Sequence, residues 1–143
     1  MKEFTLHIME TDGTIYDGNC LSIVVPTIEG MYGVQAHHAN LFSALTTGIM
    51  KYTTPDHEDY YLAISGGMIK VENNDVVIMA DSVERPEDID ENRAHEEISE
   101  AKAAISSVDE KDEFSDITMI SAEAMMRRAI NRLKLKKRYG DYK

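Results

Sequence analysis

Apolar and polar positions alternate along the first half of the chain. Phe4, Leu6 and Ile8 are separated by single polar residues, and because successive side chains of a strand point to opposite faces, one face of this strand should meet a core. Short runs rich in Val, Ile, Thr and Tyr continue as far as Ala80, without a convincing helical repeat. Five turn-forming segments separate these runs: Asp12-Gly13, Asp17-Gly18, Glu29-Gly30, Thr54-Pro55-Asp56 and Asn73-Asn74-Asp75. The pattern predicts an antiparallel β-sandwich or barrel, and not a parallel sheet with crossover helices.

The spacing of apolar residues changes after Arg85-Pro86. Asp88, followed three residues later by Glu91, has the form of an acidic N-cap, and the surrounding carboxylates suit the positive end of a helix dipole. Apolar residues then recur at steps of three and four on two stretches, namely Ala94, Ile98, Ala101, Ile105 and Val108, and then Met119, Ala122, Met126, Ala129 and Leu133. The acidic segment 109–116 between the two stretches is predicted to be a turn. The second half should therefore be an antiparallel helix hairpin.

The predicted fold class is α+β, with a β-sandwich domain at residues 1–85 and a helix-hairpin domain at residues 86–143. Small side chains dominate both helical stripes, so the helices can approach closely but bury little apolar surface. At roughly 25 cal/mol per Å² of buried apolar area and at least ~1 kcal/mol of entropy per ordered residue, such a hairpin should be barely stable alone. We therefore expect it either to dock on its own sheet domain or to extend towards a partner.

Charge is distributed unevenly along the chain. The formal net charge of −11 argues against a nucleic-acid partner, because phosphate recognition depends on lysine and arginine. Residues 117–143 nevertheless carry eight basic and two acidic side chains, while the rest of the chain is strongly acidic. Any partner of this last segment should therefore be acidic.

Cysteine usage and hydropathy indicate the compartment. The single cysteine, Cys20, excludes an internal disulfide and a multi-cysteine metal site, and is expected to be a small buried apolar residue. No apolar run approaches the ~18 residues needed to cross a bilayer, and the N-terminal MKEFTLHIME lacks the unbroken apolar stretch of a signal peptide. We expect a chain that stays in the cytosol and holds no metal.

The five histidines and many carboxylates form no recognisable catalytic pattern. His37 and His38 are adjacent and would point in different directions on a regular backbone. The motifs H-E-x-x-H, G-x-S-x-G and G-x-x-x-x-G-K-[ST] are absent from the sequence, and Gly66-Gly67 is too small a signal for a phosphate loop. We therefore expect no catalysis, and no catalytic residues, in this chain alone.

Five segments, taken in order, carry a resemblance to a known family: TDGTIYDG (11–18), VVPTIEGMYGVQAHHA (24–39), AISGGMIKVENNDVVIMAD (63–81), EDIDENRA (87–94) and RRAINRL (127–133). Together they resemble the epsilon subunit of the F-type, rotary ATP synthase. The resemblance implies a β-sandwich followed by an antiparallel helix pair, in agreement with the periodicity. It also implies a non-catalytic subunit of the central stalk of a proton-translocating enzyme.

The resemblance further implies the partners of the chain. The subunit would join the gamma subunit to the membrane ring of c subunits, and would restrain ATP hydrolysis when its C-terminal helices extend towards the alpha and beta subunits. It would lie on the cytoplasmic side of a bacterial cell membrane as a peripheral protein, attached only through the complex.

Two sets of contact residues follow from the same resemblance. The polar loops of the c ring would meet the turn formed by Glu29, Gly30, Met31, Tyr32, Gly33 and His38, in which the glycines would allow backbone conformations closed to other residues. An acidic segment of beta would meet Arg127, Arg128, Arg132, Lys134, Lys136 and Lys137. Two alternatives remain open. For the first set, the alternative is that the glycines merely turn the chain. For the second, it is that the basic residues form a solvated face that balances the charge of the acidic first helix.

Residues 89–94, IDENRA, match the ATP-binding signature of the family. Carried over by position, the nucleotide contacts would be Glu84, Ile89, Asp90, Arg93, Ala94, Arg128 and Arg132. The carboxylate of Asp90 could hydrogen-bond an amino purine, and planar guanidinium groups form paired bonds with phosphate oxygens. No cofactor is required, and ATP is the regulatory ligand implied. The sequence departs from nucleotide-binding relatives at Glu100, where these have a basic residue.

The same hinge residues allow two other interpretations. In the first, Asp90 and Arg93 form an ion pair within the helix or between the domains, and Arg93 acts as a hinge clasp rather than a ligand contact. In the second, the chain is a free-standing ATP-sensing protein that works without a rotary complex. Association with gamma and c subunits would distinguish the second interpretation from a stalk subunit.

Overall fold

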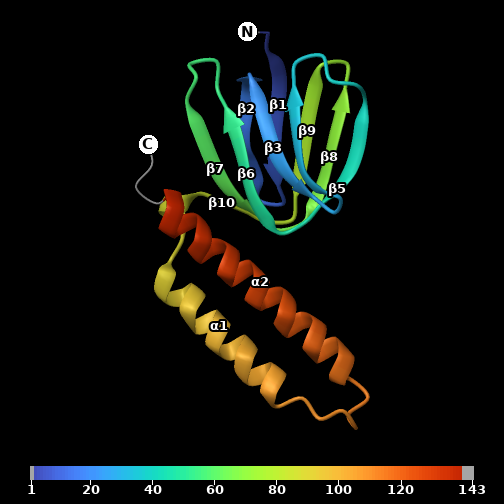
Figure 1. Ribbon diagram of the computed structural model, residues 1–143, viewed down its shortest axis with the longest axis vertical. Coiled ribbons are helices and arrows are strands. Elements are labelled where there is room, and N and C mark those ends of the chain that lie inside the picture. The colour runs from blue at the N-terminus through green and yellow to red at the C-terminus, as the bar shows by residue number, and fades with distance from the viewer. Residues whose placement is uncertain (1, 140–143) are drawn as a thin grey trace.

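The computed structural model describes residues 2–139 (Figure 1). Ten strands come first: β1 (Phe4–Glu10), β2 (Gly13–Cys20), β3 (Ser22–Thr27), β4 (Gly30–Gln35), β5 (Leu41–Leu45), β6 (Gly48–Thr53), β7 (Asp59–Ile64), β8 (Gly67–Glu72), β9 (Asp75–Ala80) and β10 (Val83–Glu84). A short 3₁₀ turn, η1 (Pro86–Asp88), leads into the helices α1 (Glu91–Ser106) and α2 (Ser115–Tyr139). The helices lie side by side below the sandwich in Figure 1, and the loop between them is far from it. The predicted α+β class is confirmed.

Hydrogen bonds join the strands in the order β10-β7-β6-β3-β5-β8-β9-β1-β2, with β4 paired to β3. Only one residue pair, Thr27 with Leu45, connects β3 to β5. The sheet therefore bends there into two layers, β4-β3-β6-β7-β10 and β5-β8-β9-β1-β2. The described strand pairs are antiparallel except for β1 with β9, which run parallel. This exception brings the first strand beside a late one, a non-local pairing that alternation along the sequence does not reveal.

One apolar core fills the space between the two layers. Every strand contributes at least one buried residue to it, and the alternation predicted for the first strand is confirmed, because Phe4, Leu6 and Ile8 are at most 2% exposed. Cys20 is fully buried there, as predicted, and its thiol donates to the carbonyl of Thr53 at 3.1 Å. Burial of each large aliphatic side chain contributes roughly 1.5–3 kcal/mol, so the sandwich has the larger share of the stabilising apolar contacts.

The predicted turn at Asp17-Gly18 is wrong, because both residues lie inside β2. The carboxylate of Asp17 contacts Nδ1 of His7 on the paired strand at 2.8 Å. Gly18 leaves room for Tyr16, whose Oη would lie 3.2 Å from a Cβ at position 18. Side-chain packing across the strand therefore overrides the turn propensity of this dipeptide. The other four predicted turn segments do join consecutive strands.

The N-cap of the first helix lies two residues later than the predicted cap at Asp88. Residues 86–88 form the 3₁₀ turn, and the N-cap is Asp90, whose carboxylate accepts a hydrogen bond from the backbone N–H of Arg93 at 3.1 Å. The reason is tertiary: Ile89 is extended and is buried against the sandwich. This contact fixes the direction of the chain before the helix can start.

The two helices meet through the small residues of the predicted stripes. Ala94, Ala101, Ala122 and Ala129 are at most 5% exposed, whereas the longer stripe residues are only half-buried: Ile98, Ile105, Val108, Met119, Met126 and Leu133. The stripes are thus confirmed within the helices, and so is their small apolar content, but Val108 was wrongly included because α1 ends at Ser106. Of the helices in the described part of the chain, none combines the length and the apolar character that a membrane crossing requires.

A second face of α2 docks on the sandwich. Leu135 is fully buried in a small cluster with Ala63 and Ile89. Four residues further on, the ring of Tyr139 stacks on that of Tyr61, with centroids 3.7 Å apart and planes inclined by 6°. Of the two outcomes expected for a marginal hairpin, the described residues adopt the docked one.

Candidate functional site

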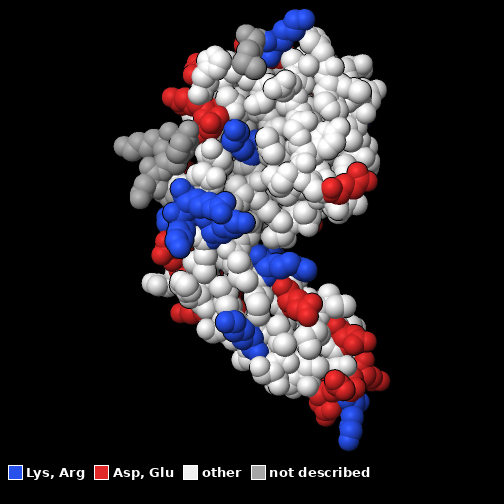
Figure 2. All heavy atoms as spheres, viewed as in Figure 1, with Lys and Arg blue, Asp and Glu red and all other residues white. Residues whose placement is uncertain are grey.

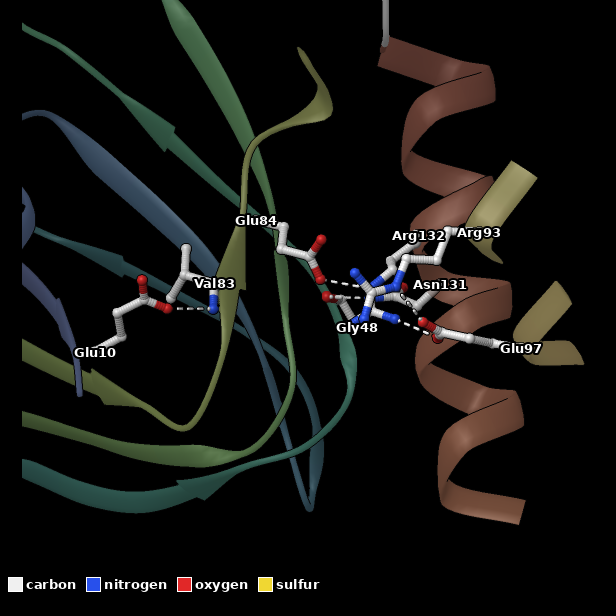
Figure 3. A network of polar contacts seen from close by, with 8 residues as sticks. All are labelled: Glu10, Gly48, Val83, Glu84, Arg93, Glu97, Asn131 and Arg132. Carbon is white, nitrogen blue, oxygen red and sulfur yellow. Dashed lines mark hydrogen bonds and ion pairs between the residues drawn. The ribbon is translucent and has the colours of Figure 1, made fainter. Parts of the chain in front are cut away.

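Polar contacts gather where the sandwich, α1 and α2 meet (Figure 3). Arg132 on α2 bonds the carboxylate of Glu84 on β10 through Nε, and that of Glu97 on α1 through Nη1 at 2.7 Å. The three side chains are 20–28% exposed, so solvent screens these ion pairs less than it would at an open surface. One guanidinium group thus links both helices to the sandwich. We call this set of three residues the Arg132 junction.

Two hydrogen bonds from α2 side chains to backbone carbonyls support the Arg132 junction on both sides. The ammonium group of Lys136, one turn beyond Arg132, donates to the carbonyl of Pro86 at 3.0 Å. The side chain of Asn131 donates to the carbonyl of Gly48 at 2.9 Å. These bonds tie the last turns of α2 to the linker and to β6, so that release of the hairpin must break them together.

Asp90 and Arg93 do not form the ion pair considered from the sequence. The carboxylate of Asp90 caps α1 instead. The side chain of Arg93 is 77% exposed, and its Nε contacts Oε1 of Glu97 at 3.3 Å along the same helix. The clasp between domains that was predicted for Arg93 is therefore made by Arg132, and Arg93 remains accessible.

Two hollows open beside the Arg132 junction. The first, of about 370 Å³, is lined by five of the seven predicted nucleotide contacts: Glu84, Asp90, Arg93, Ala94 and Arg132. The second, of about 400 Å³, adds Arg128 beside the two other arginines. Ile89 lines neither hollow, because it is buried in the apolar cluster under α2. The fold thus brings six of the seven residues together, from three separate elements.

Carboxylates outnumber guanidinium groups around the first hollow and equal them in number around the second. Beyond the predicted residues, the first is lined by Glu10, Asp88 and Glu97, and the second by Glu96, Glu97 and Glu100. Because Arg132 already bonds two of these carboxylates, a phosphate group would have to compete with at least one of them for the guanidinium. In the docked state the guanidinium of Arg132 is therefore already bonded to carboxylates of the protein itself.

The side chains around these hollows suit binding rather than covalent chemistry. Among the described residues, no histidine or cysteine lines either hollow. Within residues 2–139, no group of three His, Cys, Asp or Glu side chains is placed to hold a metal ion. Guanidinium and carboxylate groups of this kind can hold an anion, or hold one another, and so can act as a switch between the two.

Five of the six residues predicted to meet the c ring lie on the hairpin of β3 and β4, and the sixth, His38, lies in the loop that follows β4. Gly30 has a φ of 115°, which residues with a Cβ rarely adopt, so its conformational role is as predicted. Gly33 lies inside β4 without a positive φ, so the conformational role predicted for it is wrong. Tyr32 and His38 contact each other, with Oη and Nε2 3.2 Å apart, which fixes both side chains on one side of the turn.

The tip of this hairpin is apolar as well as exposed. Ile28 and Met31, which flank Glu29 and Gly30, are 68% and 61% exposed, and Phe42 on β5 is 64% exposed. Large apolar side chains at such exposure are typical of a surface that a partner covers. Ile28 and Phe42 were not among the predicted contact residues, because the sequence does not reveal that their side chains are exposed.

The six predicted beta-contact residues do not share one surface of α2. Three are exposed (Arg127, Lys134 and Lys137), and three are half-buried (Arg128, Arg132 and Lys136). Two of the second group are bonded to the hinge region. In the docked state a partner could thus reach the first group freely, but contact by all six requires Arg132 and Lys136 to leave their bonds with the hinge region.

The sequence did not single out Glu97 or Leu135 as junction residues. Glu97 is one of several similar carboxylates on an acidic helix, and nothing local distinguishes the one that meets Arg132. Leu135 did carry a signal, since it is an isolated apolar residue between Lys134 and Lys136. An apolar residue outside the helix–helix stripe indicates a second contact surface.

Comparison with known proteins connects this architecture to one family. The family model "ATP synthase, Delta/Epsilon chain, beta-sandwich domain" matches residues 3–86, and "ATP synthase, Delta/Epsilon chain, long alpha-helix domain" matches residues 87–137. The ATP synthase epsilon chain of Shouchella clausii is 34% identical over 142 residues, which cover 98% of this chain and 99% of the relative. The epsilon chain of Latilactobacillus sakei is 33% identical over 138 residues, covering 94% and 93%.

Solved structures agree with this relationship. A chain in the Euglena gracilis mitochondrial ATP synthase, an assembly of OSCP, F1 and c-ring, superposes with a TM-score of 0.78 at 25% identity, covering 92% of this chain and 79% of that one. A chain in the central stalk and c-ring of the Tetrahymena thermophila mitochondrial ATP synthase gives 0.61 at 13% identity, covering 94% and 97%. At 13% identity, the likeness to the Tetrahymena chain shows a shared fold alone.

The sandwich with its helix hairpin therefore defines a delta/epsilon-type chain of ATP synthase, which is a non-catalytic accessory subunit. Within this class the chain belongs to the ATP synthase epsilon chain family. The resemblance drawn from five sequence segments is thereby confirmed.

Proposed function

We propose that this chain is the central-stalk epsilon subunit of a bacterial, proton-translocating F-type ATP synthase, and that its hairpin restrains ATP hydrolysis. We assign residues 1–85 to the domain that joins gamma to the c ring, and residues 86–143 to the regulatory domain. Family membership supports the subunit assignment. The c ring as a partner is supported by the Euglena relative, which was solved together with F1 and c-ring. The complex would place the chain on the cytoplasmic side of the cell membrane as a peripheral subunit.

The tip of the β3–β4 hairpin supports the proposed contact with the c ring. Its exposed Ile28 and Met31 offer apolar area, and Glu29 and Gly30 offer a charge and an unobstructed backbone. Polar loops of a ring could bond the backbone and the carboxylate while the apolar side chains are covered. Such a mixed surface is typical of protein interfaces with an apolar centre and a polar rim.

The Arg132 junction is the observation that carries the regulatory part. The hairpin is held to the sandwich mainly by Arg132, Asn131, Lys136 and a small apolar cluster at Leu135. Each polar contact is of a kind that another carboxylate or carbonyl can replace. When an acidic partner attracts α2, one set of ion pairs would therefore replace another. The docked and the released hairpin would then differ only modestly in free energy, so that binding of a ligand or partner can shift the equilibrium between them.

Deletion of residues 86–143 tests the proposed restraint in the assembled enzyme. ATP hydrolysis by complexes with the full chain is compared with hydrolysis by complexes with the truncated one, and co-purification of gamma and c subunits is measured for both. We expect faster hydrolysis with association retained. Unchanged hydrolysis in an intact complex would show that the hairpin is no brake. Loss of gamma and c subunits from the full-length preparation would favour the free-standing sensor.

We further propose that ATP is a regulatory ligand of the Arg132 junction. Arg93 is accessible and Arg128 lines the adjoining hollow, so both can approach phosphates without breaking the clasp. A ligand that binds only the docked state stabilises it by RT ln(1 + [L]/Kd), about 2.7 kcal/mol at a hundredfold excess over Kd. This is sufficient to bias a hairpin that is marginally stable by itself.

Arg93→Ala tests the nucleotide proposal without disturbing the hairpin, because the side chain bonds only Glu97 on its own helix among the described residues. We expect the melting temperature of the wild-type chain to rise with ATP, and the rise to be reduced in Arg93→Ala and in Arg128→Ala. Arg127→Ala, an exposed arginine outside both hollows, is the matched control. An equal rise in all variants would place the nucleotide elsewhere.

A further inference from the structure

A third hollow lies on the other side of α2, between the helix and the outer face of the sandwich. Its floor is formed by β3, β6 and β7, in which Lys51 pairs with Val24 on one side and with Tyr61 on the other. The neighbours of Lys51 on β6, Met50 and Tyr52, are buried in the core. Because strand side chains alternate, Lys51 points outwards, towards α2.

The wall of this hollow is the last part of α2. Asn131, Lys134 and Arg138 face it at helical spacing, and the stacked rings of Tyr61 and Tyr139 close one end. The volume is about 660 Å³, within the range of small-molecule sites. It shares no lining residue with the two hollows at the Arg132 junction. We call it the Lys51 pocket.

The charge of the Lys51 pocket is opposite to that of the chain. Three cations line it, Lys51, Lys134 and Arg138, and no aspartate or glutamate of the described residues does, although the net charge of the chain is −11. Within residues 2–139, none of the three forms an ion pair. Figure 2 shows basic side chains gathered at the C-terminal end of α2 and a further one on the neighbouring face of the sandwich, while acidic side chains gather at the loop end of the hairpin.

Three unpaired cations around one hollow repel one another, and an anion between them would remove that repulsion. The remaining lining offers hydroxyl groups from Thr46 and Thr47 and an apolar patch from Pro26 and Ile49. Ammonium and guanidinium groups together suit phosphate, which accepts several charge-assisted hydrogen bonds at once. An apolar patch beside such groups suits a ligand with a non-polar part.

We propose that the Lys51 pocket binds a phosphate-bearing anion, held between Lys51 of the sandwich and Lys134 and Arg138 of α2. The ligand is either a soluble phosphate compound or the headgroup of an anionic phospholipid. Because the cations come from both domains, the bound anion bridges them and favours the docked hairpin. This inference does not depend on the nucleotide site proposed at Arg93.

Calorimetric titration of the full-length chain with inorganic pyrophosphate tests the proposal. Loss of a charged hydrogen-bond partner is expected to weaken binding about tenfold or more in Lys51→Ala. Lys137→Ala is the matched control, because Lys137 is an exposed lysine on the same helix that does not line the pocket. Lys51→Arg should retain most of the affinity, and Arg93→Ala should leave it unchanged. Denaturant unfolding of each variant confirms that it is folded.

Flotation with lipid vesicles distinguishes the two sources of phosphate. Vesicles of phosphatidylcholine with phosphatidylglycerol are compared with pure phosphatidylcholine, using wild type, Lys51→Ala and Lys137→Ala. Binding of pyrophosphate that depends on Lys51 assigns a soluble ligand, and Lys51-dependent binding of only the anionic vesicles assigns a headgroup. Binding of neither probe, or equal binding by Lys51→Ala and Lys137→Ala, overturns the proposal.

Discussion

The sandwich and the hairpin are held together by different kinds of contact. In the sandwich, buried residues from all ten strands, most of them large and aliphatic, fill one core. In the hairpin, alanines form the buried contacts between the helices, and the contact with the sandwich depends on Arg132, Leu135 and a few polar bonds. The difference teaches that one chain can combine a stable platform with an element that detaches at a much lower free-energy cost.

Removal of a core side chain from the sandwich should have the largest effect. Ile78→Ala deletes buried methyl and methylene groups from a fully buried site, and we expect the free energy of unfolding to fall by about 2–5 kcal/mol. The matched control is Ile117→Ala on α2, where the side chain is 63% exposed, with an expected change within ~0.5 kcal/mol. Urea denaturation measures both, and similar losses in the two variants would contradict the comparison.

Removal of the clasp should have a smaller and more local effect. Arg132→Ala leaves the carboxylates of Glu84 and Glu97 without their shared partner, and we expect the docked hairpin to lose about 1–3 kcal/mol. Amide hydrogen exchange should become faster in α1 and α2 while the strands remain protected. Arg127→Ala, which lies on the same helix and is exposed, should leave exchange unchanged.

Cys20 provides a second readout for the same variant. The thiol is buried in the sandwich, and this burial raises its pKa, so thiol reagents should react only after the sandwich opens. The labelling rate should therefore be equal in wild type and Arg132→Ala. Faster labelling in the variant would mean that hairpin and sandwich open together, and the proposed separation of the two would be lost.

Alkaline pH should produce the smallest effect, and only in the sandwich. Burial raises the pKa of Tyr52 to about 12 from 10.0, so the folded state disfavours the phenolate. The stabilising contribution of the neutral phenol is complete below pH ~10 and is lost as the pH rises through the folded-state pKa. Stability should fall by about 1–2 kcal/mol over this interval, a value reduced for partial solvent screening. Tyr52→Phe should flatten the profile in pH-dependent denaturation, and an equally steep profile would assign the loss to other groups.

Much of the fold and part of the site could be predicted from periodicity and turn chemistry. Alternation located the strand at Phe4, and steps of three and four located the alanine stripes, because both depend on residues close in sequence. The cap was misplaced at Asp88 because the burial of Ile89 against the sandwich delays the helix. Asp17-Gly18 was mistaken for a turn because His7, which contacts Asp17, becomes its neighbour only when β1 pairs with β2.

The candidate site shows the same division. The sequence supplied Arg132, Glu84 and Arg93 as members of one region, and the structure brought them together. The sequence could not show that Arg132, and not Arg93, is the clasp, since either guanidinium group could bond a carboxylate. Lys51 was not singled out at all, because it is distant in sequence from the α2 residues that line the pocket with it, and these residues face it only when the helix docks.

By itself, the sequence determined the α+β class, the order of strands and helices, the small-residue character of the hairpin and the basic end of its second helix, all of which follow from local spacing and composition. Tertiary structure alone decided that β1 runs parallel to β9, that Leu135 anchors α2, that Arg132 is the clasp and that three cations surround one pocket. These features depend on contacts between residues that are distant in sequence. The free energy of such a contact depends on both residues, which come together only when the chain folds.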